Sequence, residues 1–370
     1  SSSKATNPPF LQTTDLSASV GGSNLTLVSG LPAPPAVDPT LRPGGSTRSA
    51  FDINYRDQKA LNWNLNVQKQ LGRDYMVEVA YVGTRGRNYT LKTNLNQAPP
   101  ILGVANADIN RPAVKLGSPA LRDVGAVTSL GSLDYHALLF KGVKRFSKGF
   151  SALVSYTYGK ALDLASDNDG GVTLTNIFDP NYDRAVATYD VKHTFVASFI
   201  YELPFARNHF LGGWQINGIA YARSGIPVNI TQTGQMTSIG LGSGQAQQPR
   251  PNIVGNLVPS DQSIDHWFDA SALQRPADTT ATFGNIARNY GRGPGVFNVD
   301  VSLVKNTSFG RVNSQLRLEA FNVFNHPQFG QPNGQLGNAA FGTITASGNP
   351  QCGTCGTSER QIQAAIKLRF

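Results

Sequence analysis

The sequence predicts an all-β fold, in which long antiparallel strands form part of a transmembrane β-barrel with long extracellular loops. Apolar and polar residues alternate with a period of two over nine stretches of the chain. Every second connection between these stretches is long, and aromatic residues gather near both of their ends. Charged residues make up only 15% of the chain, against about 25% in an average soluble domain. This composition suits a sheet with a large uncharged outer face.

The last eleven residues, Arg360–Phe370, show the alternation most clearly. One face carries Ile362, Ala364, Ile366, Leu368 and Phe370. The length matches the roughly 9 to 11 residues with which a tilted strand crosses a bilayer. Phe370 is then expected to be the C-terminal aromatic residue at the periplasmic interface. By itself the pattern also fits an amphipathic edge strand of a soluble protein.

Eight further strands precede this one. We expect them at Leu61–Leu71, Tyr75–Tyr81, Ala137–Phe146, Phe150–Tyr158, Thr194–Leu203, Trp214–Arg223, Phe297–Val304 and Gln315–Phe324. Each places apolar residues at alternate positions and so forms an apolar face, and the adjoining short turns contain Gly, Asn, Asp or Pro.

The connections between the strands alternate in length. Short turns are expected at 72–74, 147–149, 204–213 and 305–313. Long connections are expected at 84–131, 160–192, 224–295 and 325–359. Outer-membrane barrels have this layout, with short periplasmic turns and long extracellular loops. A sandwich or a propeller would scatter its loop lengths.

The aromatic residues form two groups separated by one strand length. The short-turn end carries Tyr75, Phe146, Phe150, Phe205, Trp214 and Phe370, and the long-loop end carries Trp63, Tyr81, Tyr158, Phe195 and Phe297. Aromatic rings favour both membrane interfaces. A hydrocarbon layer between the two groups is therefore predicted, and with it a location in the cell outer membrane.

Nine strands are an odd number, and an unpaired strand edge is costly in lipid. The first strand runs toward the short-turn side, and the last strand ends there. We therefore expect the chain to be the C-terminal part of a larger barrel. Residues 1–59, with paired prolines and glycines, are expected to be an irregular extracellular loop region, and residues 60–370 the barrel portion without a plug domain.

Composition and motifs argue against several other functions. The net charge is +9, but Lys and Arg are scattered, so no nucleic-acid partner is expected. No HExxH motif or G-x-S-x-G elbow occurs. An enzyme, a metal site and a cofactor are therefore not expected. Cys352 and Cys355 could form a redox pair, half a zinc site or a small disulfide, and a loop disulfide in an oxidising compartment is the favoured interpretation.

The polar faces of the strands would point into a barrel lumen. They carry Glu78, Lys141, Glu202, Asp300, Arg317, Glu319, Lys367 and Arg369. On the last two strands, Arg317 is expected near Lys367, with Glu319 diagonal to it. Such ladders commonly satisfy one another or a plug surface, so no solute-binding site is assigned to them.

Several segments resemble TonB-dependent outer-membrane receptors of the Oar-like class, which belong to the carboxypeptidase-regulatory-like TonB-dependent transporters. The resemblance covers about residues 60–370. It rests on the runs Tyr182-Asp183-Arg184, Tyr189-Asp190-Val191-Lys192-His193-Thr194-Phe195, Tyr201-Glu202-Leu203-Pro204-Phe205, Gly291-Arg292-Gly293-Pro294-Gly295, Asn298-Val299-Asp300-Val301-Ser302, Arg317-Leu318-Glu319-Ala320-Phe321-Asn322-Val323-Phe324-Asn325-His326-Pro327 and Arg360-Gln361-Ile362-Gln363.

The resemblance implies a barrel of about 22 strands, filled by an N-terminal plug, of which this chain would supply the fourteenth to the twenty-second. It implies a receptor or transporter for a bulky solute that is powered by the TonB system through N-terminal regions absent here. Other expected partners are outer-membrane lipid and lipopolysaccharide, and the barrel-assembly machinery through the C-terminal strand. The alternative is an outer-membrane adhesin or structural surface barrel without transport.

Overall fold

The computed structural model describes residues 48–103, 107–117, 124–166, 174–205, 212–234, 236–241, 249–277, 280–347 and 359–370. Within these ranges no helix is both long and apolar enough to span a bilayer. The helical elements among the described residues are η1 (Ala107–Asn110), α2 (Pro112–Lys115), η2 (Pro180–Asp183), η3 (Thr237–Ile239) and η4 (Ala270–Ala272).

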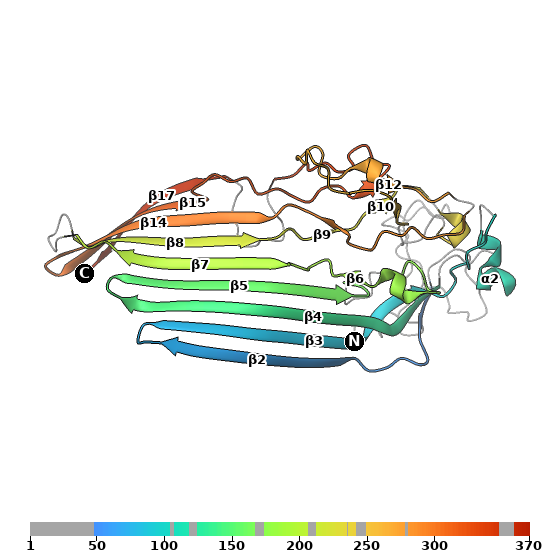
Figure 1. Ribbon diagram of the computed structural model, residues 1–370, viewed down its shortest axis with the longest axis horizontal. Coiled ribbons are helices and arrows are strands. Elements are labelled where there is room, and N and C mark those ends of the chain that lie inside the picture. Colours follow the sequence, from blue (N-terminus) through green and yellow to red (C-terminus); the bar gives the residue numbers. More distant parts are fainter. Residues whose placement is uncertain are drawn as a thin grey trace, which may run out of the picture.

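Nine long strands form one antiparallel sheet in which each strand pairs with its neighbours along the chain (Figure 1). They are β2 (Lys59–Leu71), β3 (Tyr75–Asn94), β4 (Val124–Ser147), β5 (Phe150–Asp163), β7 (His193–Glu202), β8 (Trp214–Arg223), β14 (Val296–Phe309), β15 (Val312–Phe321) and β17 (Gln361–Arg369). The all-β prediction and its nine strands are confirmed. The boundaries of β8 agree with the sequence prediction at both ends.

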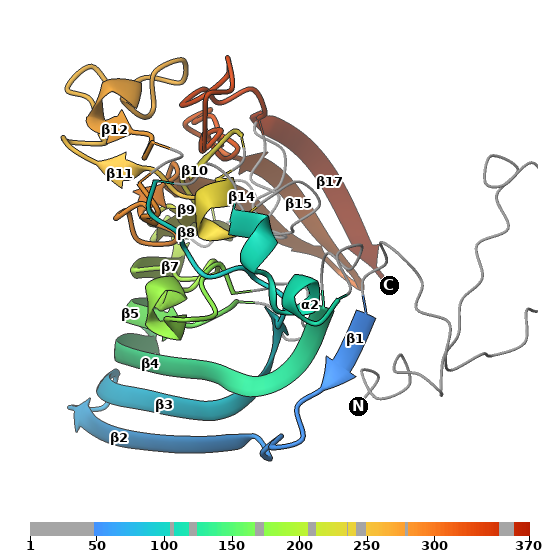
Figure 2. The ribbon, with the colours of Figure 1, turned by 90° about the vertical axis from the view of Figure 1, so that its right-hand side faces the viewer.

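Viewed along the strands, the sheet curves like part of a barrel wall (Figure 2). Its two edges are β2 and β17, and in the described ranges neither pairs with the other. The sheet is therefore an open segment of a barrel, and its edges carry main-chain groups that a complete wall would pair.

Two strands are much longer than the sequence predicts. β3 has 20 residues and β4 has 24, so their pairing continues into the expected loop at 84–131. The register shifts near Asn88, which has a left-handed φ of 61°. A bulge of this kind breaks the alternation of faces. The period of two is lost from the sequence there, although the pairing goes on.

Other strand ends also differ from their predictions. β15 stops at Phe321 rather than Phe324, because Asn322 has a φ of 49° and its side chain bonds the main chain of His326. β14 continues to Phe309, so the turn expected at 305–313 is reduced to Gly310 and Arg311. The short turn between β4 and β5, at Lys148 and Gly149, lies where it was expected.

The long connections lie together at the end of the sheet opposite the short turns (Figure 1). They contain the short strands β6 (Ala185–Val186), β9 (Pro227–Val228), β10 (Thr231–Gln232), β11 (Asn252–Ile253), β12 (Leu273–Gln274), β13 (Gly291–Arg292) and β16 (Gln335–Leu336). In the segment 1–59, residues 1–47 lie outside the described ranges. β1 (Arg48–Phe51) pairs with the start of β4 in parallel.

Candidate functional site

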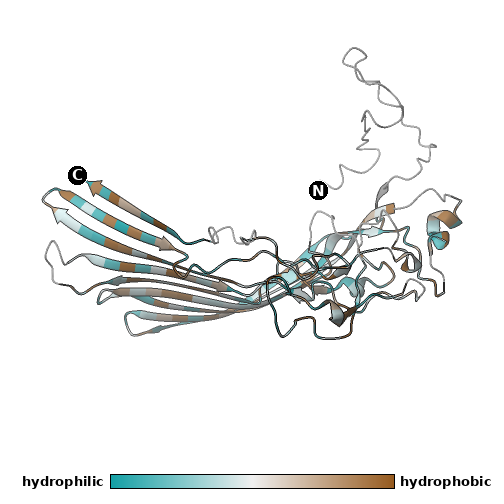
Figure 3. Cartoon of the chain, turned by 90° about the horizontal axis from the view of Figure 1, so that it is seen from above, coloured by the Kyte–Doolittle hydropathy of each residue, from teal (hydrophilic) through white to brown (hydrophobic). Residues whose placement is uncertain are grey.

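The strands leave one apolar face uncovered. On β2, Leu61, Leu65 and Val67 are 63%, 67% and 63% exposed, and on β17 Ile362 and Ile366 are 66% and 68% exposed. Colouring by hydropathy shows the alternation of apolar and polar residues along the strands (Figure 3). Soluble monomers rarely expose contiguous apolar surface on this scale. We call this surface the apolar face.

Rings and imidazoles meet at the long-loop end of the apolar face. The Tyr81 hydroxyl lies 2.7 Å from His136 Nδ1, and the Trp63 ring centroid lies 5.9 Å from that imidazole. The same contact recurs farther around the sheet, where the Tyr156 hydroxyl lies 2.7 Å from His193 Nδ1. These residues form an aromatic belt at the height where a membrane interface favours amphipathic rings.

Lysines stand over aromatic rings at the short-turn end. Lys144 Nζ lies 5.6 Å from the centre of the Tyr75 ring and 5.5 Å from that of Phe150. Lys305 Nζ lies 5.4 Å from the centre of the Trp214 ring. A lysine so placed keeps its charge at the polar boundary while its methylenes cover apolar surface. The two ends of the strands therefore both have interfacial residues.

Phe370 follows β17 at the same end of the sheet as the short turns (Figure 1). Its side chain is 94% exposed. The position fits a ring at the periplasmic interface, and the role of Phe370 as the C-terminal aromatic signal stays a prediction.

The polar face holds a ladder of amides and carboxylates. Asn66 Nδ2 donates to Glu78 Oε1 at 2.6 Å, and Glu78 is directly opposite Lys141 in the register. Gln363 Nε2 donates to Glu319 Oε2 at 2.7 Å. These contacts pair neighbouring strands through side chains as well as through the main chain.

The expected pairing of Lys367 with Arg317 is wrong, because the register of the last two strands differs from the expected one by two residues. The register places Lys367 opposite Gln315 and places Arg317 opposite Ala365, while Glu319 lies opposite Gln363. Arg317 instead forms an ion pair with Glu319 at 3.2 Å on its own strand. A slip of two residues keeps every side chain on its face, so the hydropathy pattern cannot detect it.

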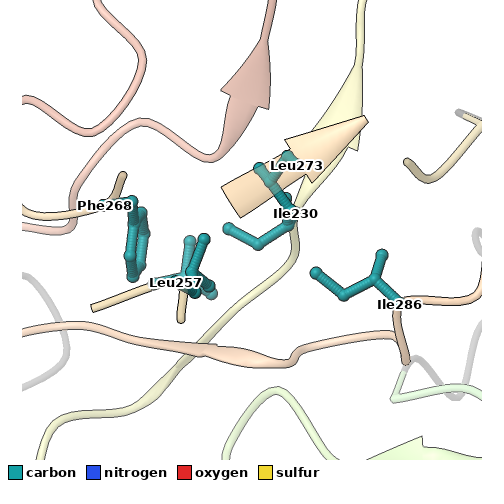
Figure 4. Packing of buried hydrophobic residues seen from close by; sticks show 6 residues of the cluster. Ile230, Leu257, Phe268, Leu273 and Ile286 are labelled. Atoms are coloured by element: carbon teal, nitrogen blue, oxygen red, sulfur yellow. The ribbon is translucent and has the colours of Figure 1, made fainter. Parts of the chain in front are cut away.

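The long loops have a hydrophobic core of their own. It consists of Val228, Ile230, Leu257, Phe268, Leu273 and Ile286 (Figure 4). All six residues belong to the connection between β8 and β14, and Leu336 and Phe341 of the next connection pack against them. The extracellular segments in this region therefore form a packed body, which we call the loop assembly.

Ion pairs join two of the long connections. Arg250 Nη1 lies 2.7 Å from Asp183 Oδ1, and the two side chains are 2% and 5% exposed. Arg250 also lies over the Tyr182 ring, at 3.9 Å from its centre. The buried charges are therefore both paired and hydrogen-bonded, which is the condition under which such burial is tolerated.

Two further pairs repeat the arrangement. Arg292 Nη2 lies 2.6 Å from Asp190 Oδ2, and Arg288 pairs with Asp163. In every case the carboxylate precedes β7 and the arginine precedes β14. The three pairs therefore fasten the end of β5 and the connection that follows it to the connection after β8.

The surroundings shift the pKa of two groups in the loop assembly. Burial raises the pKa of the Tyr182 hydroxyl, although the neighbouring Arg250 acts in the opposite direction. Hydrogen bonds from the Ser271 hydroxyl and main chain lower the pKa of the Asp269 carboxyl. At neutral pH the Tyr182 hydroxyl therefore stays protonated and donates to the Gly284 carbonyl oxygen. The Asp269 carboxyl stays ionised and accepts from Ser271.

The sequence alone did not assign a role to the paired aspartates and arginines. Asp183, Asp190 and Arg292 lie in the runs that carry the family resemblance, which was the available signal. Cys352 and Cys355 lie outside the described residues. Within the described ranges, no group of three or more His, Cys, Asp or Glu is close enough to hold a metal ion.

The sequence matches a known family along almost its entire length. Residues 1–363 match the family described as "Outer membrane beta barrel domain". The chain belongs to this family. The protein is accordingly located in the cell outer membrane, and the apolar face of its outer membrane β-barrel domain is the surface in contact with hydrocarbon.

A comparison with curated protein sequences gave no match. Several solved structures resemble the chain, and three of them are named here. They are the outer membrane transporter YddB from Escherichia coli (11% identity, TM-score 0.45, 88% of this chain and 34% of that one), the FrpB iron transporter from Neisseria meningitidis, F3-3 variant (14%, 0.38, 86% and 32%), and BauA, the ferric preacinetobactin receptor from Acinetobacter baumannii (10%, 0.40, 85% and 30%). This chain thus covers only 30 to 34% of the length of these proteins.

Proposed function

We propose that the chain is the C-terminal barrel portion of an Oar-like, TonB-dependent outer-membrane receptor that takes up a bulky solute. In this proposal, residues 60–370 form the wall, residues 1–59 an extracellular segment, and a plug domain and a TonB box lie upstream. The chain itself has no catalytic role.

The observation that carries the proposal is a nine-stranded, curved sheet whose edge strands, β2 and β17, each have a strand on one side only within the described part of the chain. Unpaired N–H and C=O groups are not tolerated in hydrocarbon, so β2 and β17 need further strands as neighbours. A larger barrel has a lumen wide enough to need a plug. The polar face with Glu78, Lys141 and Glu319 is suited to line such a lumen.

The folded loop assembly supports a binding role at the cell surface. Its hydrophobic core and its Asp–Arg pairs, two of them buried, hold the loops in a fixed arrangement. A rigid surface loses less entropy when it binds a solute. The same rigidity would also serve an adhesin, so the loops alone do not distinguish the two functions.

The test is whether TonB binds. The full-length gene product, purified from outer membranes in detergent, is immobilised and exposed to the purified periplasmic domain of TonB from the same organism. A receptor is expected to bind this domain, and to lose binding when the segment upstream of residue 1 is removed. The absence of binding, together with reduced attachment of cells that lack the protein, supports the adhesin instead.

A further inference from the structure

Basic side chains gather on the apolar face just beyond the aromatic belt. The group consists of Lys59, Arg85, Arg87, Lys160 and Arg184, and we call it the basic cluster. Residues that oppose each other in an antiparallel pair share a face. Arg85 opposes Leu61, Arg87 opposes Lys59, and Lys160 opposes His136. The basic cluster therefore continues the surface that faces the membrane.

The height of the cluster matches the lipid headgroups. Arg85 lies two residues beyond Gly83, which is opposite the belt residue Trp63. This is about 7 Å along a strand and about 5 Å of height at a tilt of about 45°. The headgroup layer extends roughly 5 to 8 Å beyond the hydrocarbon on each side of a bilayer. The cluster lies at the long-loop end, so the layer concerned is the outer one.

Asp134 organises the arginines of the cluster. Arg87 Nη2 lies 3.0 Å from its carboxylate and Arg184 Nη2 lies 2.5 Å from it, while Arg85 approaches at 3.6 Å. One carboxylate cannot occupy all the N–H donors of three guanidinium groups. With two lysines added, the five basic side chains exceed the single acid by four charges. The surplus donors are exposed, because the Arg85 side chain is 60% and the Arg184 side chain 38% exposed.

We propose that the basic cluster binds the phosphate group of one lipopolysaccharide molecule of the outer leaflet. The guanidinium groups of Arg85 and Arg184 and the ammonium group of Lys160 donate to the phosphate oxygens. The acyl chains of the lipid lie along the apolar face below, beside His136 and the belt. Arg87 and Asp134 act as positioning residues, since their ion pair fixes the edge of the site.

The test measures the binding of lipid A to the full-length protein in detergent by native mass spectrometry. Arg85→Gln combined with Lys160→Gln is expected to weaken the binding of diphosphorylated lipid A by about 25-fold, since each basic side chain near a lipid surface contributes about fivefold. Asp134 keeps Arg87 and Arg184 as partners in this variant, so the fold is expected to persist. Electrophoresis of heated and unheated samples checks this, because a folded barrel changes its migration when it is heated.

The control removes the same charge from the opposite end of the sheet. Lys69→Gln combined with Arg73→Gln is expected to leave the affinity within a factor of about two; both side chains are exposed near the short turn. Dephosphorylated lipid A is expected to bind weakly to the wild type. Its affinity for the cluster variant is expected to be about the same, because the removed side chains have no phosphate to contact. Inorganic phosphate at millimolar concentration is not expected to displace the lipid, which distinguishes a lipid site from a free-phosphate site.

Three results overturn the proposal. They are unchanged affinity of the cluster variant for diphosphorylated lipid A, equal binding of the dephosphorylated lipid by the wild type, and an equal loss of affinity in the control variant. The assay does not involve TonB. Its outcome is therefore separate from that of the proposed uptake function.

Discussion

At the scale of single residues, Arg250 holds together two loops that are distant in sequence. Its guanidinium group is buried against Asp183 and Tyr182. Replacement by Met keeps the volume but leaves the Asp183 carboxylate buried without this cation. We expect Arg250→Met to destabilise the loop assembly by about 3 to 5 kcal/mol. Limited proteolysis of the purified protein in detergent, read as the rate of cleavage between residues 160 and 295, measures the effect.

Arg275→Met is the matched control, because Arg275 is an exposed arginine of the same connection whose bond goes to the main chain of Thr233. Its cleavage rate is expected to stay close to that of the wild type. Equal cleavage of the Arg250 variant and the wild type would show that the ion pair contributes nothing to the rigidity of the loops.

The pairing of these charges could not be predicted from the sequence. Arg250 and Asp183 are 67 positions apart, and Arg288 and Asp163 are 125 apart. Neither loop has a periodic pattern that would indicate which side chain lies inside. The family resemblance drew attention to Asp183 and to Arg292, but only the packed loop assembly shows that each has an opposite charge beside it.

At the scale of elements, the alternation of side chains was enough to locate the strands where one face meets hydrocarbon. β8 was predicted at both boundaries, and β2, β7 and β17 to within two residues. β5 begins where it was predicted but continues five residues beyond its expected end at Tyr158. The prediction fails where hydrocarbon no longer selects apolar residues. β3 and β4 continue past the belt as polar, bulged ladders, and the short strands of the loop assembly have only two residues each, too few to show a period.

The joint between the wall and the loop assembly is sensitive at Gly225. This glycine follows β8, and a Cβ placed on it would overlap the carbonyl oxygen of Gly293 in the facing segment before β14. Because both groups are main chain, neither can rotate away. We expect Gly225→Ala to separate β9 from β13 and to cost about 1 to 3 kcal/mol. The measurement is the temperature at which the folded form disappears in heat-modifiability electrophoresis.

Gly142→Ala is the control for this prediction. A Cβ at Gly142 would meet only the Phe140 ring, at 3.7 Å, which is an ordinary van der Waals contact. Its transition temperature is expected to remain near that of the wild type. A Gly225 variant that melts together with this control would mean that the segments at the joint can move apart freely.

At the scale of the whole molecule, the lipid faces one side of the sheet and the lumen the other. The strands that pair with the two edges determine how many strands the complete barrel has. Hydrogen bonds along β2 and β17 need partners within the bilayer. If the nine strands closed on themselves, β2 would pair with β17. If the barrel is larger, other strands lie between them, and the two edges face different neighbours.

Cross-linking distinguishes these arrangements. In full-length protein with Cys352 and Cys355 replaced by Ser, Asn64→Cys on β2 and Gln363→Cys on β17 are expected not to form a disulfide under oxidation in native membranes. A disulfide needs Cα atoms within about 7 Å, and intervening strands about 4.8 Å apart would exceed that distance. Gln315→Cys with Lys367→Cys is the positive control, since these residues are direct partners on β15 and β17. A disulfide between β2 and β17 as efficient as this control would mean a barrel of nine strands, with no room for a plug and no basis for the proposed uptake.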